Sequence, residues 1–236
     1  HDALPISTIV RTCKKLGYQG YYHLKIALAK EVINPDNSYP ENTDFSDITS
    51  LATFLLKKQA EDLIQSTQFF NADVLESILK LLANCDTIFF FAAGNSNPLA
   101  VYSAYKFSQL GLKTVVHVSP EMQINAAYSM GKRDLAIGIS NSGSTNLMVD
   151  IFKVVKERGA KSVCITNYIK SPLSKLSTHQ LNTAVSDKIF FEAFDSTRVP
   201  AMGVIDMLVL LFMYKNKAHY EKYRTREEFL GSRFKG

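Results

Sequence analysis

Apolar and polar residues alternate along the chain in patterns that divide it into three parts. Residues 8–16 and 21–31 carry apolar side chains at helical spacing, with Ser7 as the expected N-cap of the first helix and Gly17 just past its end. The stretch 34–42 is rich in Asn, Pro and Asp and interrupts any regular structure. We therefore predict a helical segment at residues 1–33, a linker at 34–46 and a larger domain at 47–215.

The larger domain begins with helices and continues with strands that alternate with helices. Residues 47–83 predict two helices, with a break near Phe70 and with Asn71 as the N-cap of the second. Five short and almost wholly apolar runs follow, at 88–93, 114–118, 135–139, 162–166 and 181–185. Strands that are apolar on both faces are typical of a parallel sheet covered by helices on both sides. We predict an α/β fold with a doubly wound, five-stranded parallel sheet, and we assume the flavodoxin-like strand order 2-1-3-4-5.

Composition fits an intracellular globular protein. Of the 236 residues, 46% are hydrophobic and 21% are charged. The three cysteines are odd in number and lack metal-ligand spacing, which argues against a disulfide framework or a zinc site. The apolar run 199–214 is interrupted by Asp206 and is shorter than the roughly 20 residues of a membrane-spanning helix. We expect a buried core helix there, no secretory signal, no membrane partner and a cytoplasmic location.

The two ends of the chain differ from its middle. The formal net charge of +5 is concentrated at the ends, and we treat residues 216–236 as a basic, solvated tail rather than a DNA contact. The chain begins with His1, and its first six residues fit poorly with the helical pattern of residues 8–31. We expect the natural protein to extend further upstream.

The loop after the first predicted strand has the sequence AGNSN at 93–97 and leads into a predicted helix at 98–110. Gly94 allows a tight turn, and Ser96 lies at the helix start, where its hydroxyl and nearby amides face the region above the sheet. An ordinary N-cap explains this serine equally well.

The loop after the third predicted strand carries a stronger signal. Its sequence SNSGST at 140–145 supplies four hydroxyls and one glycine between a strand and a helix, from Ser140, Ser142, Gly143, Ser144 and Thr145. A phosphate dianion favours many donors, closely approaching amides and a helix N-terminus. A capping loop needs only one hydroxyl, so four favour an anion site. In the assumed strand order the two loops flank the same crevice.

Nucleotide cofactors are not expected, and we predict no cofactor. The loops lack the G-x-x-x-x-G-K-[ST] pattern of a phosphate-binding NTPase loop, and Gly94 alone does not complete a dinucleotide fingerprint.

The two loops together resemble the sugar isomerase (SIS) domain, in which a G-x-S loop and an S-x-S-G-x-T loop hold a phosphosugar. The following stretch KSVCITN at 161–167 is also typical of that family, and the resemblance covers roughly residues 47–215. It implies that Gly94, Ser96, Ser140, Ser142, Gly143, Ser144 and Thr145 bind the ligand. We expect the phosphate on the second loop, and we place Glu121 on the sugar hydroxyls.

The first part of the chain resembles the end of the helix-turn-helix domain of RpiR-type regulators. The sequences that carry this resemblance are STIVRTCKKLGYQGY at 7–21 and HLKIALAKE at 23–31. In that family the first of these helices is the recognition helix. The resemblance therefore implies DNA contacts from Ser7, Thr8, Arg11, Lys14 and Lys15. The three basic residues also share one helical face, although a solvated face alone would explain them.

The sequence departs from these families at two places. The earlier helices of the DNA-binding domain are absent, so the recognition helix lacks its scaffold. The stretch TRVPAMGVID at 197–206 resembles the family helix S-R-I-A-Q-L-x-V-I-D, but Ala201 replaces the glutamine and Pro200 enters the first turn, which tolerates it.

Two functions remain after the resemblance. We predict a non-enzymatic transcriptional regulator of carbohydrate metabolism, with a phosphosugar effector, operator DNA as partner of the full-length protein, and a homo-oligomeric assembly that reads paired half-sites. The alternative is a sugar-phosphate isomerase or lyase of the SIS class, which needs an acid or base such as Glu121, Glu192 or, less suitably, His117. The helix-turn-helix remnant favours the regulator.

Overall fold

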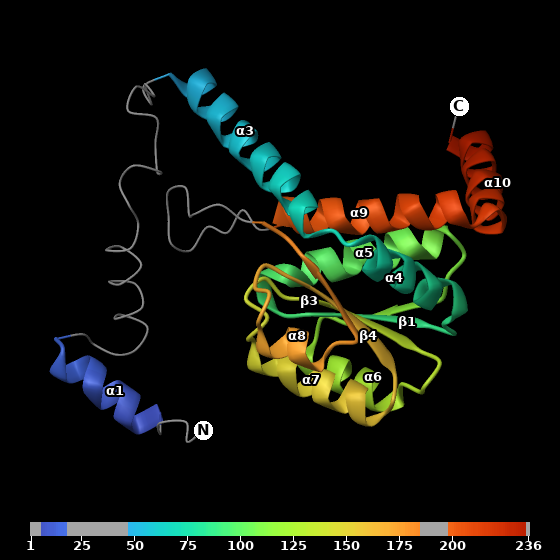
Figure 1. The fold of residues 1–236 in the computed structure, drawn as a ribbon. Helices are drawn as coiled ribbons and strands as arrows, with labels where there is room; N and C mark the ends of the chain where they lie inside the picture. The colour runs from blue at the N-terminus through green and yellow to red at the C-terminus, as the bar shows by residue number, and fades with distance from the viewer. Residues whose placement is uncertain (1–5, 18–46, 185–197, 235–236) are drawn as a thin grey trace. The chain divides into compact units, whose positions relative to one another are not determined.

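The computed structural model describes residues 6–17, 47–184 and 198–234 (Figure 1). The chain divides into two compact units, His1–Phe54 and Leu55–Gly236. The linker predicted at 34–46 and the helix predicted at 21–31 lie outside the described residues.

The described part of the first unit contains helix α1 (Ile6–Lys15) and the start of α3. The helix α1 begins one residue before Ser7, so the prediction that Ser7 is its N-cap was wrong. Its end agrees with the sequence, because Gly17 follows the last turn with φ +85°. A glycine adopts this left-handed conformation without the steric cost that a side chain adds.

Helix α3 (Ile48–Ser66) passes from the first unit into the second and is followed by the short 3-10 turn η2 (Thr67–Phe69) and by α4 (Ala72–Asn84). The predicted break at Phe70 is confirmed. The side chain of Asn71 accepts hydrogen bonds from the amides of Asp73 and Val74 at 2.9 and 3.1 Å, which confirms it as the N-cap of α4.

The second unit contains a five-stranded parallel sheet in the order β2-β1-β3-β4-β5, as predicted. Its strands are β1 (Ile88–Ala92), β2 (Thr114–Val116), β3 (Leu135–Ile139), β4 (Lys161–Thr166) and β5 (His179–Asn182). The connections include the turn η3 (Gly94–Ser96) and the helices α5 (Asn97–Gln109), α6 (Pro120–Ser129), α7 (Asn146–Glu157) and α8 (Pro172–Leu176).

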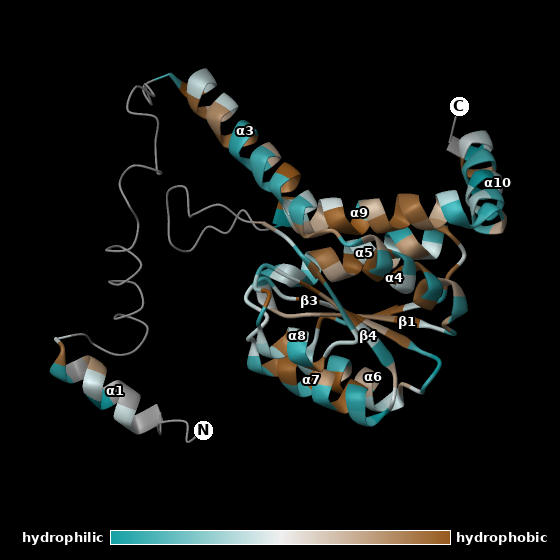
Figure 2. Ribbon diagram, viewed as in Figure 1, coloured by the Kyte–Doolittle hydropathy of each residue, from teal (hydrophilic) through white to brown (hydrophobic). Residues whose placement is uncertain are grey.

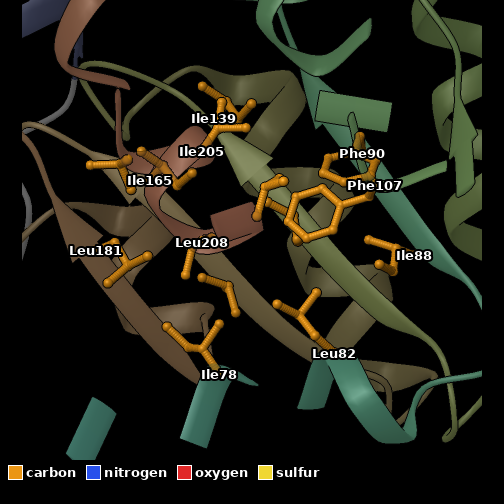
Figure 3. Close-up of a cluster of buried hydrophobic side chains, with 14 of the residues drawn as sticks. Ile78, Leu82, Ile88, Phe90, Phe107, Ile139, Ile165, Leu181, Ile205 and Leu208 are labelled. Carbon is orange, nitrogen blue, oxygen red and sulfur yellow. The ribbon is translucent and has the colours of Figure 1, made fainter. Parts of the chain in front are cut away.

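Helices cover both faces of this sheet, and Figure 1 shows α4, α5 and α9 on one side and α6, α7 and α8 on the other. Alternate residues of β1 enter opposite cores. Phe90 packs with α4, α5 and α9 (Figure 3), whereas Phe89 and Phe91 pack with α6 and α7. Each fully buried side chain of this size contributes about 1.5–3 kcal/mol relative to an exposed one. Burial on both faces explains why the strands read as unbroken apolar runs.

The predicted core helix is confirmed as α9 (Arg198–Lys215), which buries seven residues including Pro200 and Ala201. On α5, the hydroxyl of Tyr102 donates a hydrogen bond to Asp206 of α9 at 2.7 Å. Within the described ranges no single helix is long and apolar enough to cross a membrane, although α9 and α10 together reach that length and composition across a bend of 109°.

Most of the region treated as a basic tail forms helix α10 (Lys217–Phe234). Its residues are predominantly hydrophilic, as Figure 2 shows. Part of its positive charge is neutralised within the helix, because Arg224 lies 2.9 Å from Glu221 and 3.6 Å from Glu228.

Candidate functional site

The two loops selected from the sequence leave the same edge of the sheet. Strands β1 and β3 are neighbours, and their last residues, Ala92 and Ile139, pair with each other. Helix α5 then covers one face of the sheet and α7 the other. The connections therefore diverge between β1 and β3, which is the place where open α/β sheets bind ligands.

The second loop is clamped by the connection that follows β4. The carbonyl of Asn141 accepts hydrogen bonds from the amide of Asn167 and the hydroxyl of Thr166, both at 3.0 Å. The carbonyl of Gly143 accepts one from the amide of Leu173 at 2.9 Å. These bonds fix the loop backbone before any ligand arrives, which lowers the entropy cost of binding.

Gly143 has no room for a side chain. It adopts φ +58°, and an added Cβ would overlap Oγ of Ser171 and lie 2.5 Å from its Cβ and 2.9 Å from Oγ1 of Thr166. The backbone of the hydroxyl loop thus lies directly against the start of α8. A glycine is the residue that both the conformation and the space allow.

The loop presents hydroxyls to solvent at the start of α7. Ser142, Ser144 and Thr145 are exposed, and Oγ of Ser144 donates to Oγ of Ser142 at 3.1 Å. Ser140 is buried, so its hydroxyl is the least accessible of the four. Thr145 is in the N-cap position of α7 but its side chain makes no capping hydrogen bond.

The first loop also has a glycine at positive φ, and a single serine follows it before the next helix. Gly94 is exposed and has φ +55°, which lets the chain turn into η3 directly after β1. Ser96 is half-buried and precedes α5, but its side chain makes no capping hydrogen bond. Ser96 thus lies at the helix start, as predicted, but its hydroxyl does not cap the helix.

Glu121 lies in the first turn of α6, as expected. The hydroxyl of Ser119 donates to its Oε2 at 2.5 Å, and this hydrogen bond lowers the pKa of the Glu121 carboxyl. The carboxylate is exposed and ionised at neutral pH. It therefore accepts hydrogen bonds readily and is a poor proton donor.

Sequence reasoning missed Gln123, which fixes this end of α6. Its buried side-chain oxygen accepts a hydrogen bond from the backbone amide of Ala92 at 3.2 Å. Its side-chain NH2 group donates one to the carbonyl of Ala92 at 2.9 Å. The start of α6, with Glu121, is thereby held beside the last residue of β1. A glutamine inside a helix carries no signal in the sequence that would have revealed this role.

The helices around the switch point differ in capping from others in the described chain. At α4 and α8 a side chain, Asn71 or Ser171, accepts hydrogen bonds from first-turn amides. At α5, α6 and α7, which follow β1, β2 and β3, the N-cap side chain makes no such bond. First-turn amides have no partner within their own helix and carry the positive end of its dipole. Fewer donors remain at α5 and α6, because the amide of Asn97 donates to the carbonyl of Gly94 and because Pro120 has no N–H. The start of α7, next to the hydroxyl loop, is therefore the best supplied with unclaimed donors.

Other candidates from the sequence lie elsewhere. His117 lines a hollow of about 350 Å³ beside β2, with Phe89, Val115, Met122 and Asn125, and none of the predicted ligand residues lines it. Glu192 lies outside the described residues. The described ranges contain no group of three His, Cys, Asp or Glu side chains arranged to hold a metal ion.

The predicted DNA contacts belong to α1, in the first unit. The side chains of Thr8, Arg11 and Lys15 are exposed, and the last two lie one helical turn apart. The side chains of Ser7 and Lys14 lie outside the described part.

Two curated relatives are matched over most of this chain and most of their own length. An HTH-type transcriptional regulator of Clostridium perfringens is 29% identical over 205 residues, covering 86% of this chain and 74% of the relative. Another from Caldanaerobacter subterraneus is 29% identical over 222 residues, covering 92% and 77%. The bifunctional protein glk of Burkholderia thailandensis is also 29% identical, but only 32% of its length is covered.

Solved structures show the same fold. The Vibrio vulnificus NanR protein, solved in complex with ManNAc-6P, has a TM-score of 0.76 at 23% identity, covering 95% of this chain and 80% of that one. The sugar isomerase domain of an RpiR transcription factor from Sphaerobacter thermophilus has a TM-score of 0.68 at 18% identity, covering 75% and 98%. The family model for the SIS domain matches residues 81–211, which include both loops and more than half of the chain. The chain belongs to the SIS domain family.

Proposed function

We propose that this chain is the effector-sensing part of a DNA-binding transcriptional regulator, and that its SIS domain binds a phosphosugar. The observation that carries the proposal is the clamped hydroxyl loop at the switch point, surrounded by three helix starts without side-chain caps. Hydroxyls, free amides and helix dipoles are the groups that bind a phosphate dianion.

In this site the phosphate lies on the second loop. Ser142, Ser144 and Thr145 donate hydroxyl hydrogen bonds to it, together with the first-turn amides of α7, and Ser140 and Gly143 hold the loop in shape. The sugar extends toward α5 and α6. There Ser96 and the ionised carboxylate of Glu121 take its hydroxyl groups.

The relatives support sensing without turnover. Two relatives that are matched over most of their own length are HTH-type transcriptional regulators. The basic residues Arg11 and Lys15 of α1 then contact operator DNA, in a domain at residues 1–33 joined by a linker at 34–46.

Such a regulator acts in the cytoplasm as a homo-oligomer, because paired half-sites require paired DNA-binding domains. The described surface offers apolar side chains for this assembly. Leu56 and Ile64 of α3 and Leu210 and Tyr214 of α9 are all exposed.

A thermal-shift series with phosphosugars tests the sensing role. The compounds are N-acetylmannosamine 6-phosphate, glucosamine 6-phosphate, N-acetylmuramic acid 6-phosphate and ribose 5-phosphate. A ligand at ~100 times its dissociation constant adds ~2.7 kcal/mol of stability. The variant Ser142→Ala should lose most of the shift. The control Ser108→Ala, at the far end of α5, should keep it, since its hydroxyl donates to the carbonyl of Tyr105. No shift with any compound would refute the proposal, and conversion of a compound in NMR spectra would make the protein an enzyme.

Binding of random-sequence duplex DNA at several salt concentrations tests the role of α1. Each of the variants Arg11→Ala and Lys15→Ala should reduce the slope of log Kobs against log salt by about 1 if its side chain contacts a phosphate. An unchanged slope in both variants would show that this basic face is only solvated.

A further inference from the structure

Two asparagines of the candidate site carry unsatisfied buried atoms. Asn97 is the first residue of α5 and Asn141 lies in the hydroxyl loop. In the described residues, Oδ1 of each side chain is buried and accepts no hydrogen bond.

Such atoms are costly and therefore uncommon. A buried acceptor without a donor lowers the stability of a protein, and functional sites are among the places where it persists. Buried polar side chains elsewhere in the described ranges are satisfied, as Ser66 and Gln123 show. The two exceptions lie in the two loops that leave adjacent strands at the switch point.

These two oxygens accept hydrogen bonds, whereas the hydroxyl loop donates them to a phosphate. A phosphate dianion accepts hydrogen bonds and is repelled by a carbonyl oxygen, so it does not satisfy Oδ1 of Asn97 or Asn141. A hydroxyl or N–H group does. The two asparagines thus add acceptors to a site whose hydroxyl loop supplies donors.

We infer that Asn97 and Asn141 read the hydroxyl or N–H groups of the sugar, and that they select polyhydroxylated phosphates over phosphates with an apolar body. This inference rests on the proposed function of the same site. Both side chains are only half-buried as a whole. A rotation about χ2, which is broad for asparagine, turns the oxygen toward a ligand without a change of backbone.

The variants Asn97→Leu and Asn141→Leu test this inference because leucine has a similar shape and no acceptor. Their matched control is Asn84→Leu, since this asparagine is exposed and lies at the end of α4, which precedes β1 at the opposite edge of the sheet from both loops. Calorimetry measures affinity for the four phosphosugars named above, for cyclohexylmethyl phosphate as a hydroxyl-free counterpart, and for inorganic phosphate. Thermal unfolding without ligand measures stability.

We expect each test variant to bind the phosphosugars about tenfold more weakly, which corresponds to about 1.4 kcal/mol. Binding of inorganic phosphate and cyclohexylmethyl phosphate should change little. The midpoint of unfolding should rise by about 2–4 °C, because an unsatisfied buried acceptor is removed. The control should change neither the affinities nor the midpoint of unfolding. A purely structural asparagine would give the reverse, with a lower midpoint and an unchanged ratio of affinities.

The possible failures are distinguishable. If the wild-type chain binds a phosphosugar and both test variants bind it equally well, the inference is wrong while the proposed function stands. If a test variant loses inorganic phosphate and phosphosugar in the same proportion, its asparagine supports the phosphate loop and does not read the sugar. If the wild-type chain binds no phosphosugar, both the function and the inference are refuted.

Discussion

The substitution Gly143→Ala places a methyl group where the hydroxyl loop meets the start of α8. The new Cβ would overlap Oγ of Ser171, and this oxygen accepts the capping hydrogen bond from the amide of Ser174 at 3.1 Å. A residue with a side chain at φ +58° costs about 1–2 kcal/mol. Displacing Ser171 removes a cap that is worth ~1 kcal/mol. The free energy of unfolding should fall by about 2–3 kcal/mol in total.

The control is Gly94→Ala in the other loop. Gly94 has nearly the same φ, +55°, but an added Cβ would meet nothing within 4 Å. This variant carries only the conformational cost, about 1–2 kcal/mol. Urea unfolding of both variants therefore isolates the contribution of the close approach, and phosphosugar calorimetry shows whether the distorted loop still binds. Equal unfolding free energies for the two variants would refute the packing argument.

Three further predictions concern other groups in the second unit. Tyr102→Phe removes the hydrogen bond to Asp206 and should lower the free energy of unfolding by about 1 kcal/mol. That bond raises the pKa of Tyr102 to about 12, so the difference from wild type in urea unfolding should persist below pH 10 and vanish as the pH rises through 12. Burial raises the pKa of the Cys164 thiol to about 11, so this thiol should resist Ellman's reagent at pH 8 until the protein is unfolded. Rapid labelling of Cys164 in the native protein would contradict this prediction. Thr145→Asp should stabilise α7, because the new carboxylate caps the first-turn amides and interacts favourably with the helix dipole. The same carboxylate occupies the anion site and should therefore abolish phosphosugar binding. Retained binding in calorimetry would place the phosphate elsewhere.

The central strands were predictable because burial on both faces leaves an unbroken apolar run. The edge strands were harder. The apolar run at 114–118 predicted a strand two residues longer than β2, which ends at Val116. This strand pairs with β1 alone, and Val118 is exposed. Strand β5 begins at His179 rather than Leu181, because its first residues are half-buried and polar. An edge strand has fewer neighbours, so hydrophobicity marks its limits poorly.

The sequence predicts which residue types form the site, but not which residues hold them in place. Hydroxyls and a glycine between a strand and a helix are visible in one short stretch of sequence. The hydrogen bonds between Gln123 and Ala92, by contrast, join residues 31 positions apart. The unsatisfied oxygens of Asn97 and Asn141 depend on burial, which the fold alone determines. Sequence patterns therefore identify groups that touch a ligand better than those that hold or tune them.

Capping shows why a serine or threonine at a helix start is ambiguous in sequence. Ser171 and Thr145 both precede helices at the same edge of the sheet, yet the first accepts a hydrogen bond from the amide of Ser174 and the second accepts none. The chemistry of the two side chains is the same, so the difference comes from their surroundings. Ser171 is buried against Gly143, and its Oγ accepts from its own helix. Thr145 is exposed, and its side chain leaves the first-turn amides of α7 uncapped, as the proposed anion site requires. A helix start that is exposed, rich in hydroxyls and still uncapped is therefore a better indicator of an anion site than the hydroxyls by themselves.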